Sequence, residues 1–149
     1  MGAKTLNPRL LQDGSTLFYR DNAASDTGGF RGVADRVVIT VPLLASTVDG
    51  NVFIADRAYI VESVEEVHSV VSTSGTLMLE KCSGTTAPGS GTDVLTGTIS
   101  LAGTINTTVA GTLGTVAART LADGDRLAID IGGTMTGLVG VLTVVLRPV

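Results

Sequence analysis

Apolar and polar residues alternate along much of the chain, and this period of two predicts β-strands. The clearest stretch is residues 126–131, where an apolar residue stands at every second position after the dipeptide Asp123-Gly124. Glycine tolerates a positive φ and aspartate can hydrogen-bond within its own turn, so this dipeptide predicts a tight reversal. Residues 138–146 are almost wholly apolar and rich in Val. They are too few for a membrane-spanning helix, and they predict a strand in the middle of a sheet that is covered on both faces.

Two earlier stretches show the same period. Residues 37–41 alternate cleanly, and Pro42 predicts that this strand ends there or lies at the edge of a sheet. Residues 52–71 predict one long strand or two successive strands. Their apolar pattern slips by one position near Glu65-Glu66, which predicts a bulge or a bend at that point. A helix over residues 62–71 is the alternative, because Glu favours helices more than strands.

The middle of the chain contains shorter signals. Ser74-Gly75 predicts a hairpin-type turn, and a strand pattern follows at residues 77–80. Residues 83–92 read SGTTAPGSGT, which predicts a surface loop. A linker between domains is the alternative, but the residues that follow are too few to favour a second domain. Residues 94–115 are rich in Thr and predict two strands, or one strand and an irregular excursion. The chain as a whole predicts seven or eight short strands.

This strand count indicates an all-β, antiparallel two-sheet sandwich, of which jelly rolls and immunoglobulin-like folds are the common kinds. Hydrophobic residues make up 44% of the 149 residues, aromatic residues only 3%, and Trp is absent. The core must therefore consist of Val, Leu, Ile and Ala. The Cys–Trp–Cys pattern of immunoglobulin domains is absent as well, and periodicity by itself is equally typical of a barrel.

Residues 1–36 differ from the rest, because they hold many turn signals and only a short apolar patch. We interpret them as an extended N-terminal arm and residues 37–149 as the β-sandwich domain. The arm contains three of the five aromatic residues, which favours docking on a neighbouring molecule over a loose terminus. The anchors we expect in this partner-binding arm are Leu10, Leu11, Phe18 and Tyr19.

The charge of the chain limits its partners. The net charge is −4, and the ten basic residues form no cluster. Direct binding of nucleic acid needs a basic surface to replace the counterions of phosphates, so we do not expect it. The N-terminus shows no secretory signal, no segment predicts membrane insertion, and the single Cys82 offers no internal disulfide.

The residues that could carry catalysis or bind metal are isolated in the sequence. His68 is the only histidine, whereas a cupin-type metal site needs several, so we expect it on a sheet surface or satisfied within the core. Glu65 and Glu66 are neighbours on a predicted strand, where they face opposite sides and cannot act on one bond; we expect a solvated face there. Cys82 is expected to be a buried or half-buried thiol. We therefore expect no enzyme, no catalytic residue, no cofactor and no metal.

Three segments together resemble a known family: ADRAYIVESVEEVHSVV from Ala55, KCSGTTAPGSGTDVLT from Lys81, and RTLADGDRLAIDIGGTMTGLVGVLTVVLRPV from Arg119. They are similar to capsid cement (decoration) proteins of tailed bacteriophages, of the single-jelly-roll type. The resemblance covers about residues 37–149. It implies a structural virion protein that forms homotrimers on the outer capsid surface and bridges neighbouring major capsid subunits, without catalytic residues.

Two other functions stay open at this point. One is a receptor- or carbohydrate-binding β-sandwich module of a phage fibre or tail, which would need exposed aromatic platforms. The other is a small cupin-type enzyme, which would need bound metal. The resemblance favours the capsid cement protein over both.

Overall fold

The computed structural model describes residues 11–13, 16–18 and 36–149. The chain forms two units, residues 1–35 and residues 36–149. In the first unit, β1 (Leu11–Asp13) pairs antiparallel with β2 (Thr16–Phe18), and Leu11 lies opposite Phe18. The rest of the first unit lies outside the described residues.

The second unit is built from strands and one helical turn, α1 (Val116–Arg119). Its strands are β3 (Val37–Leu44), β4 (Gly50–Ile54), β5 (Tyr59–Val70), β6 (Thr76–Cys82), β7 (Thr92–Asp93), β8 (Ile99–Ser100), β9 (Val109–Ala110), β10 (Thr120–Leu121), β11 (Arg126–Gly132) and β12 (Val139–Pro148). The all-β class predicted from the sequence is confirmed. The helix alternative for residues 62–71 is wrong, because β5 runs through them.

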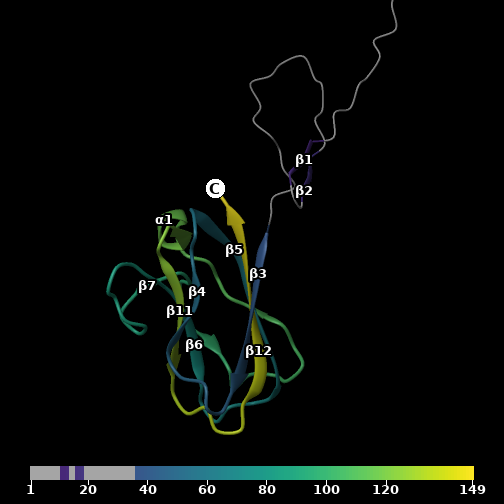
Figure 1. Ribbon diagram of the computed structural model, residues 1–149. Coiled ribbons are helices and arrows are strands. Elements are labelled where there is room, and N and C mark those ends of the chain that lie inside the picture. Colours follow the sequence, from purple (N-terminus) through teal and green to yellow (C-terminus); the bar gives the residue numbers. More distant parts are fainter. Residues whose placement is uncertain (1–10, 14–15, 19–35) are drawn as a thin grey trace, which may run out of the picture. The chain divides into compact units, whose positions relative to one another are not determined.

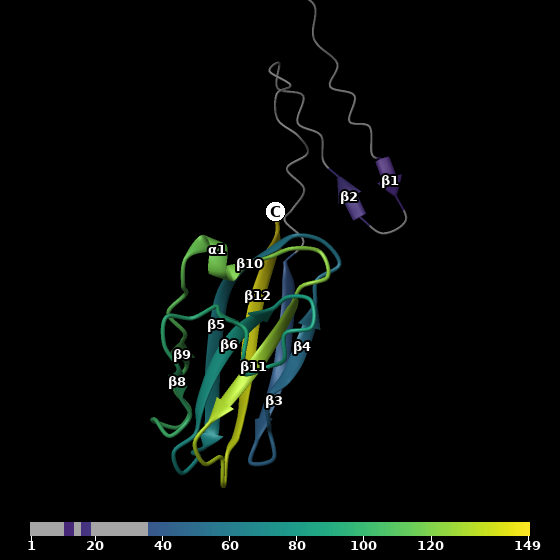
Figure 2. The same cartoon turned by 90° about the vertical axis from the view of Figure 1, so that its left-hand side faces the viewer.

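Two antiparallel sheets form the layers of this unit (Figures 1 and 2). The first sheet has the order β10-β5-β12-β3, with β9 also paired to β5. The second sheet has the order β4-β11-β6-β7, with β8 also paired to β6. The two sheets face each other across the core, so the predicted sandwich is confirmed.

The strand pairing identifies the sandwich as a jelly roll. β3 pairs with β12, β4 with β11, β5 with β9 and β10, and β6 with β7 and β8. The two halves of the chain therefore pair in reverse order, as in one long hairpin whose turn is residues 83–91. Successive pairs of this hairpin belong alternately to the first and the second sheet, which is the winding of a jelly roll.

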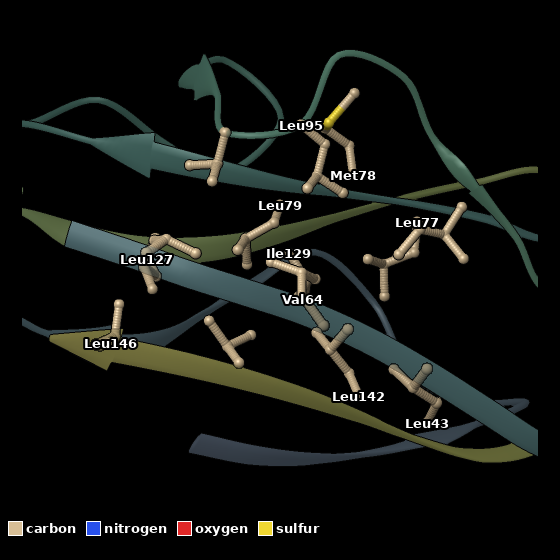
Figure 3. Packing of buried hydrophobic residues seen from close by; sticks show 14 of the residues in the cluster. Leu43, Val64, Leu77, Met78, Leu79, Leu95, Leu127, Ile129, Leu142 and Leu146 are labelled. Atoms are coloured by element: carbon tan, nitrogen blue, oxygen red, sulfur yellow. The ribbon is translucent and has the colours of Figure 1, made fainter. Parts of the chain in front are cut away.

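The core between the sheets consists mainly of aliphatic side chains (Figure 3), and Tyr59, Met78 and Met135 belong to the same cluster. Leu79, Leu127 and Ile129 point inward from the second sheet, and Val64 and Leu142 from the first. Burial of one such side chain stabilises the fold by about 1.5–3 kcal/mol. The alternation that predicted these strands therefore marks the row of each strand that faces the core.

The loop at the hairpin turn covers part of the outer face of the second sheet, over β6 and β11. Glu80 is only 4% exposed, and its Oε2 accepts hydrogen bonds from the backbone N–H groups of Gly89 and Gly91, at 2.8 and 3.3 Å. Cys82 and Ala128, which also point outward from this sheet, are fully buried. The Gly/Ser/Thr-rich loop thus belongs to the same unit as the sheets, as predicted.

Two expectations about strand environments are wrong. β12 does lie in the middle of a sheet, between β5 and β3, but only one of its rows is buried and the other is half-exposed. A strand rich in Val has the same kind of sequence whether one or both of its faces are covered, so the sequence did not distinguish the two cases. Ser74-Gly75 forms no hairpin, because β5 and β6 belong to different sheets and the segment crosses between them.

The irregularities of β5 also differ from the expected bulge at Glu65-Glu66. These two residues pair in regular register with Thr143 and Leu142. The register shifts occur instead at Glu62 and Ser69, which β12 leaves without an opposite residue. The pattern slips at Glu66 because this charged residue occupies a position that faces the core.

Candidate interaction surface

Within residues 36–149, no loop covers the outer face of the first sheet, whereas residues 83–91 cover part of the outer face of the second. Four rows of side chains cross it, each with one residue from β3, β12 and β5 in direct register. We call these residues the open face: Leu44, Val139, Val70; Pro42, Val141, Val67; Thr40, Thr143, Glu65; Val38, Val145, Ser63. All of them are exposed or half-exposed, and Glu65 is the only charged residue in this set.

One row of the open face is wholly apolar and well exposed. Leu44, Val139 and Val70 are 46%, 45% and 45% exposed. Side chains directly opposite one another on paired strands lie about 4.5–5.5 Å apart at Cβ, so these three form one continuous patch. Adjoining apolar side chains in water are typical of a surface that contacts a partner.

A charged cluster bounds the opposite end of the open face. Glu62 binds two arginines: its Oε2 lies 2.9 Å from Arg36 Nε and its Oε1 lies 2.8 Å from Arg147 Nε. Glu62 has no opposite residue in β12, and this irregularity of β5 places its carboxylate between the two arginines. Such exposed ion pairs contribute about 1 kcal/mol or less to stability, so the cluster limits the apolar surface more than it supports the fold.

β3 forms one edge of the first sheet, and Pro42 lies in it as the sequence predicted for an edge strand. Proline has no N–H, so Pro42 cannot belong to a hydrogen-bonded pair with Val141 opposite it. Such pairs alternate along antiparallel strands. The backbone groups of Val38 and Thr40 therefore point away from β12, as do those of Leu44, whose N–H donates to Thr47 Oγ1 at 2.8 Å.

Glu66 and His68 face the core from β5, on the side opposite the open face. Each is 1% exposed, and His68 Nδ1 lies 2.8 Å from Glu66 Oε1. His68 Nε2 lies 3.3 Å from the carbonyl oxygen of Gly103, whereas Glu66 Oε2 has no hydrogen-bond partner among the described residues. The expectation of a satisfied His68 is confirmed, but the solvated face expected at Glu66 is wrong.

Of the side chains suggested for chemistry, His68 and Glu66 are in contact, whereas Cys82 lies on β6 of the other sheet. Glu65 is exposed and Glu66 buried, so they face opposite sides of β5 as predicted. Burial raises the pKa of the Cys82 thiol, and the charge of nearby Glu80 raises it further. In residues 36–149 and the two short strands, no three His, Cys, Asp or Glu side chains are grouped to hold a metal ion. No helix there is long and apolar enough to cross a membrane.

The residues predicted to anchor the arm are only partly described. Leu11 and Phe18 occupy opposite positions in β1 and β2, whereas Leu10 and Tyr19 lie outside the described residues. Their docking role stays a prediction. The sequence did not reveal the open face, because the residues that form it belong to strands far apart in the chain. The only signal of this face in the sequence is the Val residues of β3, β5 and β12, and their register is known only from the structure.

Comparisons with known proteins add little to this geometry. No protein-family model and no curated protein sequence matches the chain. A solved structure titled "Structure of infectious bursal disease virus Gx strain" is similar with 16% identity and a TM-score of 0.35. The match covers 95% of this chain and 36% of that chain. A likeness of this degree carries no argument about function, so the jelly-roll assignment depends on the strand pairing described above.

Proposed function

We propose that this protein is a structural component of a virion, a cement protein that binds the outer capsid surface and bridges neighbouring major capsid subunits. The observation that carries the proposal is the open face: four in-register rows on three strands, with Glu65 as the only charge. Within residues 36–149, a loop covers part of the outer face of the other sheet, whereas this face has no such cover. The sequence resemblance to phage cement proteins supports the same function.

The energetics of the open face suit a protein that acts in many copies. Completing the burial of Leu44, Val139 and Val70 would stabilise a contact by about 2–4 kcal/mol, at ~1.5–3 kcal/mol for each full burial. One such contact alone has an affinity of about 1 mM or weaker. Linked contacts to adjacent subunits form at high effective concentration, so several together would hold the protein on a shell.

The arm would add a second attachment. We propose that Leu10, Leu11, Phe18 and Tyr19 dock on a neighbouring subunit, which would enlarge the contact without enlarging the domain. Deletion of residues 1–32 should then leave a folded β-sandwich that no longer holds capsids. Unchanged capsid binding by the truncated protein would contradict this part of the proposal.

The test combines a copy number with a pair of matched variants. We expect gradient-purified particles to contain hundreds of copies, near one per major capsid subunit. Val139→Lys places a charge within the apolar row and should abolish binding to shells that lack the protein. Ile54→Lys, at a 67% exposed position in β4 of the second sheet, makes the same change elsewhere and should bind normally.

Other outcomes of this test would refute the proposal. A few to a few dozen copies per particle would indicate a fibre or tail component, and absence from particles would exclude a virion role. Equal binding by both lysine variants would exclude the open face as the contact. The receptor- or carbohydrate-binding alternative gains no support from the described aromatic residues, because Phe53 and Tyr59 pack edge to face with ring centroids 5.5 Å apart.

A further inference from the structure

The edge of the first sheet at β3 lacks most features that prevent strands of different molecules from pairing. Edge strands are usually short, charged, bulged or covered. β3 is eight residues long, regular in its pairing with β12, and reads VVITVPLL without a charge. Among the described residues, no strand pairs with β3 on its other side, and Pro42 is its only protective feature.

The inward side of β3 is incompletely covered as well. Val37, Ile39 and Val41 point toward the core and pack against it, yet each is only partly buried. They lie at the margin of the sandwich, where the described part of the chain supplies no further strand to complete their burial. One more strand at this edge would therefore pair with the free backbone groups of β3 and complete the burial of its apolar row.

We propose that this strand is β3 of a second copy of the protein, paired antiparallel with Ile39 opposite Ile39. Residues opposite one another must point to the same face of a sheet, and this register satisfies that condition along the whole strand. It places Val38 opposite Thr40 of the second copy and Val37 opposite Val41 of the second copy.

The backbone hydrogen-bonding groups of β3 favour this register over one centred on Thr40. The N–H and C=O groups of Val38 and Thr40 face the open edge, and in this register each meets its complement on Thr40 or Val38 of the second copy. Pro42, which has only a C=O to offer, falls opposite Arg36 at the end of the pairing. A register centred on Thr40 would instead place Val38 opposite Pro42 and leave the Val38 C=O without a donor.

The result is a twofold contact in which one sheet continues through both copies. Ile39 would pack against Ile39 of the second copy, which completes the half-buried row, and β3 itself contributes no charge to the contact. The contact lies in the plane of the sheet, so it leaves the open face available and does not depend on the proposed function. It closes as a dimer, whereas the family resemblance implies a trimer.

Thr40→Pro tests the pairing in the full chain, with the assembly state measured by sedimentation velocity over a range of concentrations. The N–H that this change removes points away from β12, so the fold should survive, as far-UV circular dichroism would show. Each dimer loses two hydrogen bonds, so the dissociation constant of the dimer should increase about 30-fold. Thr40→Val keeps the N–H and should dimerise normally, and Pro42→Val adds a donor and should tighten the dimer.

A cross-linking experiment keeps the proposal testable if Thr40→Pro fails to fold. A mixture of Val38→Cys and Thr40→Cys proteins should form disulfide-linked dimers under mild oxidation in preference to either protein alone, and native Cys82 is buried. Preferential linking of the mixture would support the register. A monomer at every concentration, a trimer, or a dimer that Thr40→Pro leaves intact would overturn the proposal.

Discussion

Replacing His68 with leucine should lower the free energy of unfolding by about 1–3 kcal/mol, because the change leaves the buried Glu66 side chain without its hydrogen-bond partner. Glu66 is 1% exposed, and its only described side-chain partner is His68, at 2.8 Å from Oε1. The other carboxylate oxygen already lacks a partner among the described residues. A domain of this size has a total stability of about 5–15 kcal/mol, so one substitution would remove an appreciable part of it.

The double variant Glu66→Leu/His68→Leu should restore most of that loss. Replacing both partners of a buried hydrogen-bonded pair with apolar residues of similar shape is often nearly neutral or stabilising, and Glu66 lies opposite buried Leu142 in the ladder. Glu65→Leu is the matched control, since the next residue points to the exposed face. It should change stability by about 0.5 kcal/mol or less.

Urea unfolding followed by far-UV circular dichroism would measure these differences. The variants should differ in the transition midpoint at a constant slope, because they bury similar areas. If His68→Leu stays within about 1 kcal/mol of the unaltered protein, the carboxylate does not depend on the histidine. A double variant as unstable as the single one would equally refute the reasoning.

Two further predictions concern titratable groups. Burial beneath the loop raises the pKa of Cys82, so we expect Ellman's reagent to label this thiol only when the protein unfolds; rapid labelling of the folded protein would contradict its burial. The Tyr59 hydroxyl donates a 2.6 Å hydrogen bond to Asp56 and lowers the pKa of that carboxyl. Tyr59→Phe should therefore be less stable than the unaltered protein at neutral pH, and thermal unfolding should show the difference vanish as the pH falls through the lowered pKa. A difference that does not change with pH would exclude this cause.

Strands with one buried face were the part of the fold that the sequence predicted best. The row of Leu127 and Ile129 follows the turn at Asp123-Gly124 as expected, and Gly124 has the positive φ of 82° that this turn needs. These predictions succeed because the alternation and the turn are local properties of a few neighbouring residues.

Features that depend on distant segments were not predictable in the same way. β7, β8, β9 and β10 are two residues long, too short for any period, and their partner strands define them. Glu66 was expected in solvent because a charge usually faces outward, whereas His68 two positions on gives it a buried partner. β12 likewise has Val both on the row that faces the core and on the row that belongs to the open face. Only its pairing with β3 and β5 therefore shows which row remains uncovered.

The position of β12 has a consequence for the order in which the protein can be made. β12 lies between β3 and β5, yet it follows both in the chain, so during synthesis the first sheet stays incomplete until residues 139–148 have left the ribosome. Until then β3 and β5 each expose an unpaired edge, and such edges on nascent chains promote aggregation. Pairing of segments so far apart in sequence also slows folding. The same arrangement that gives the finished sandwich its central strand β12 therefore leaves strand edges of the nascent chain unpaired until residues 139–148 have been made.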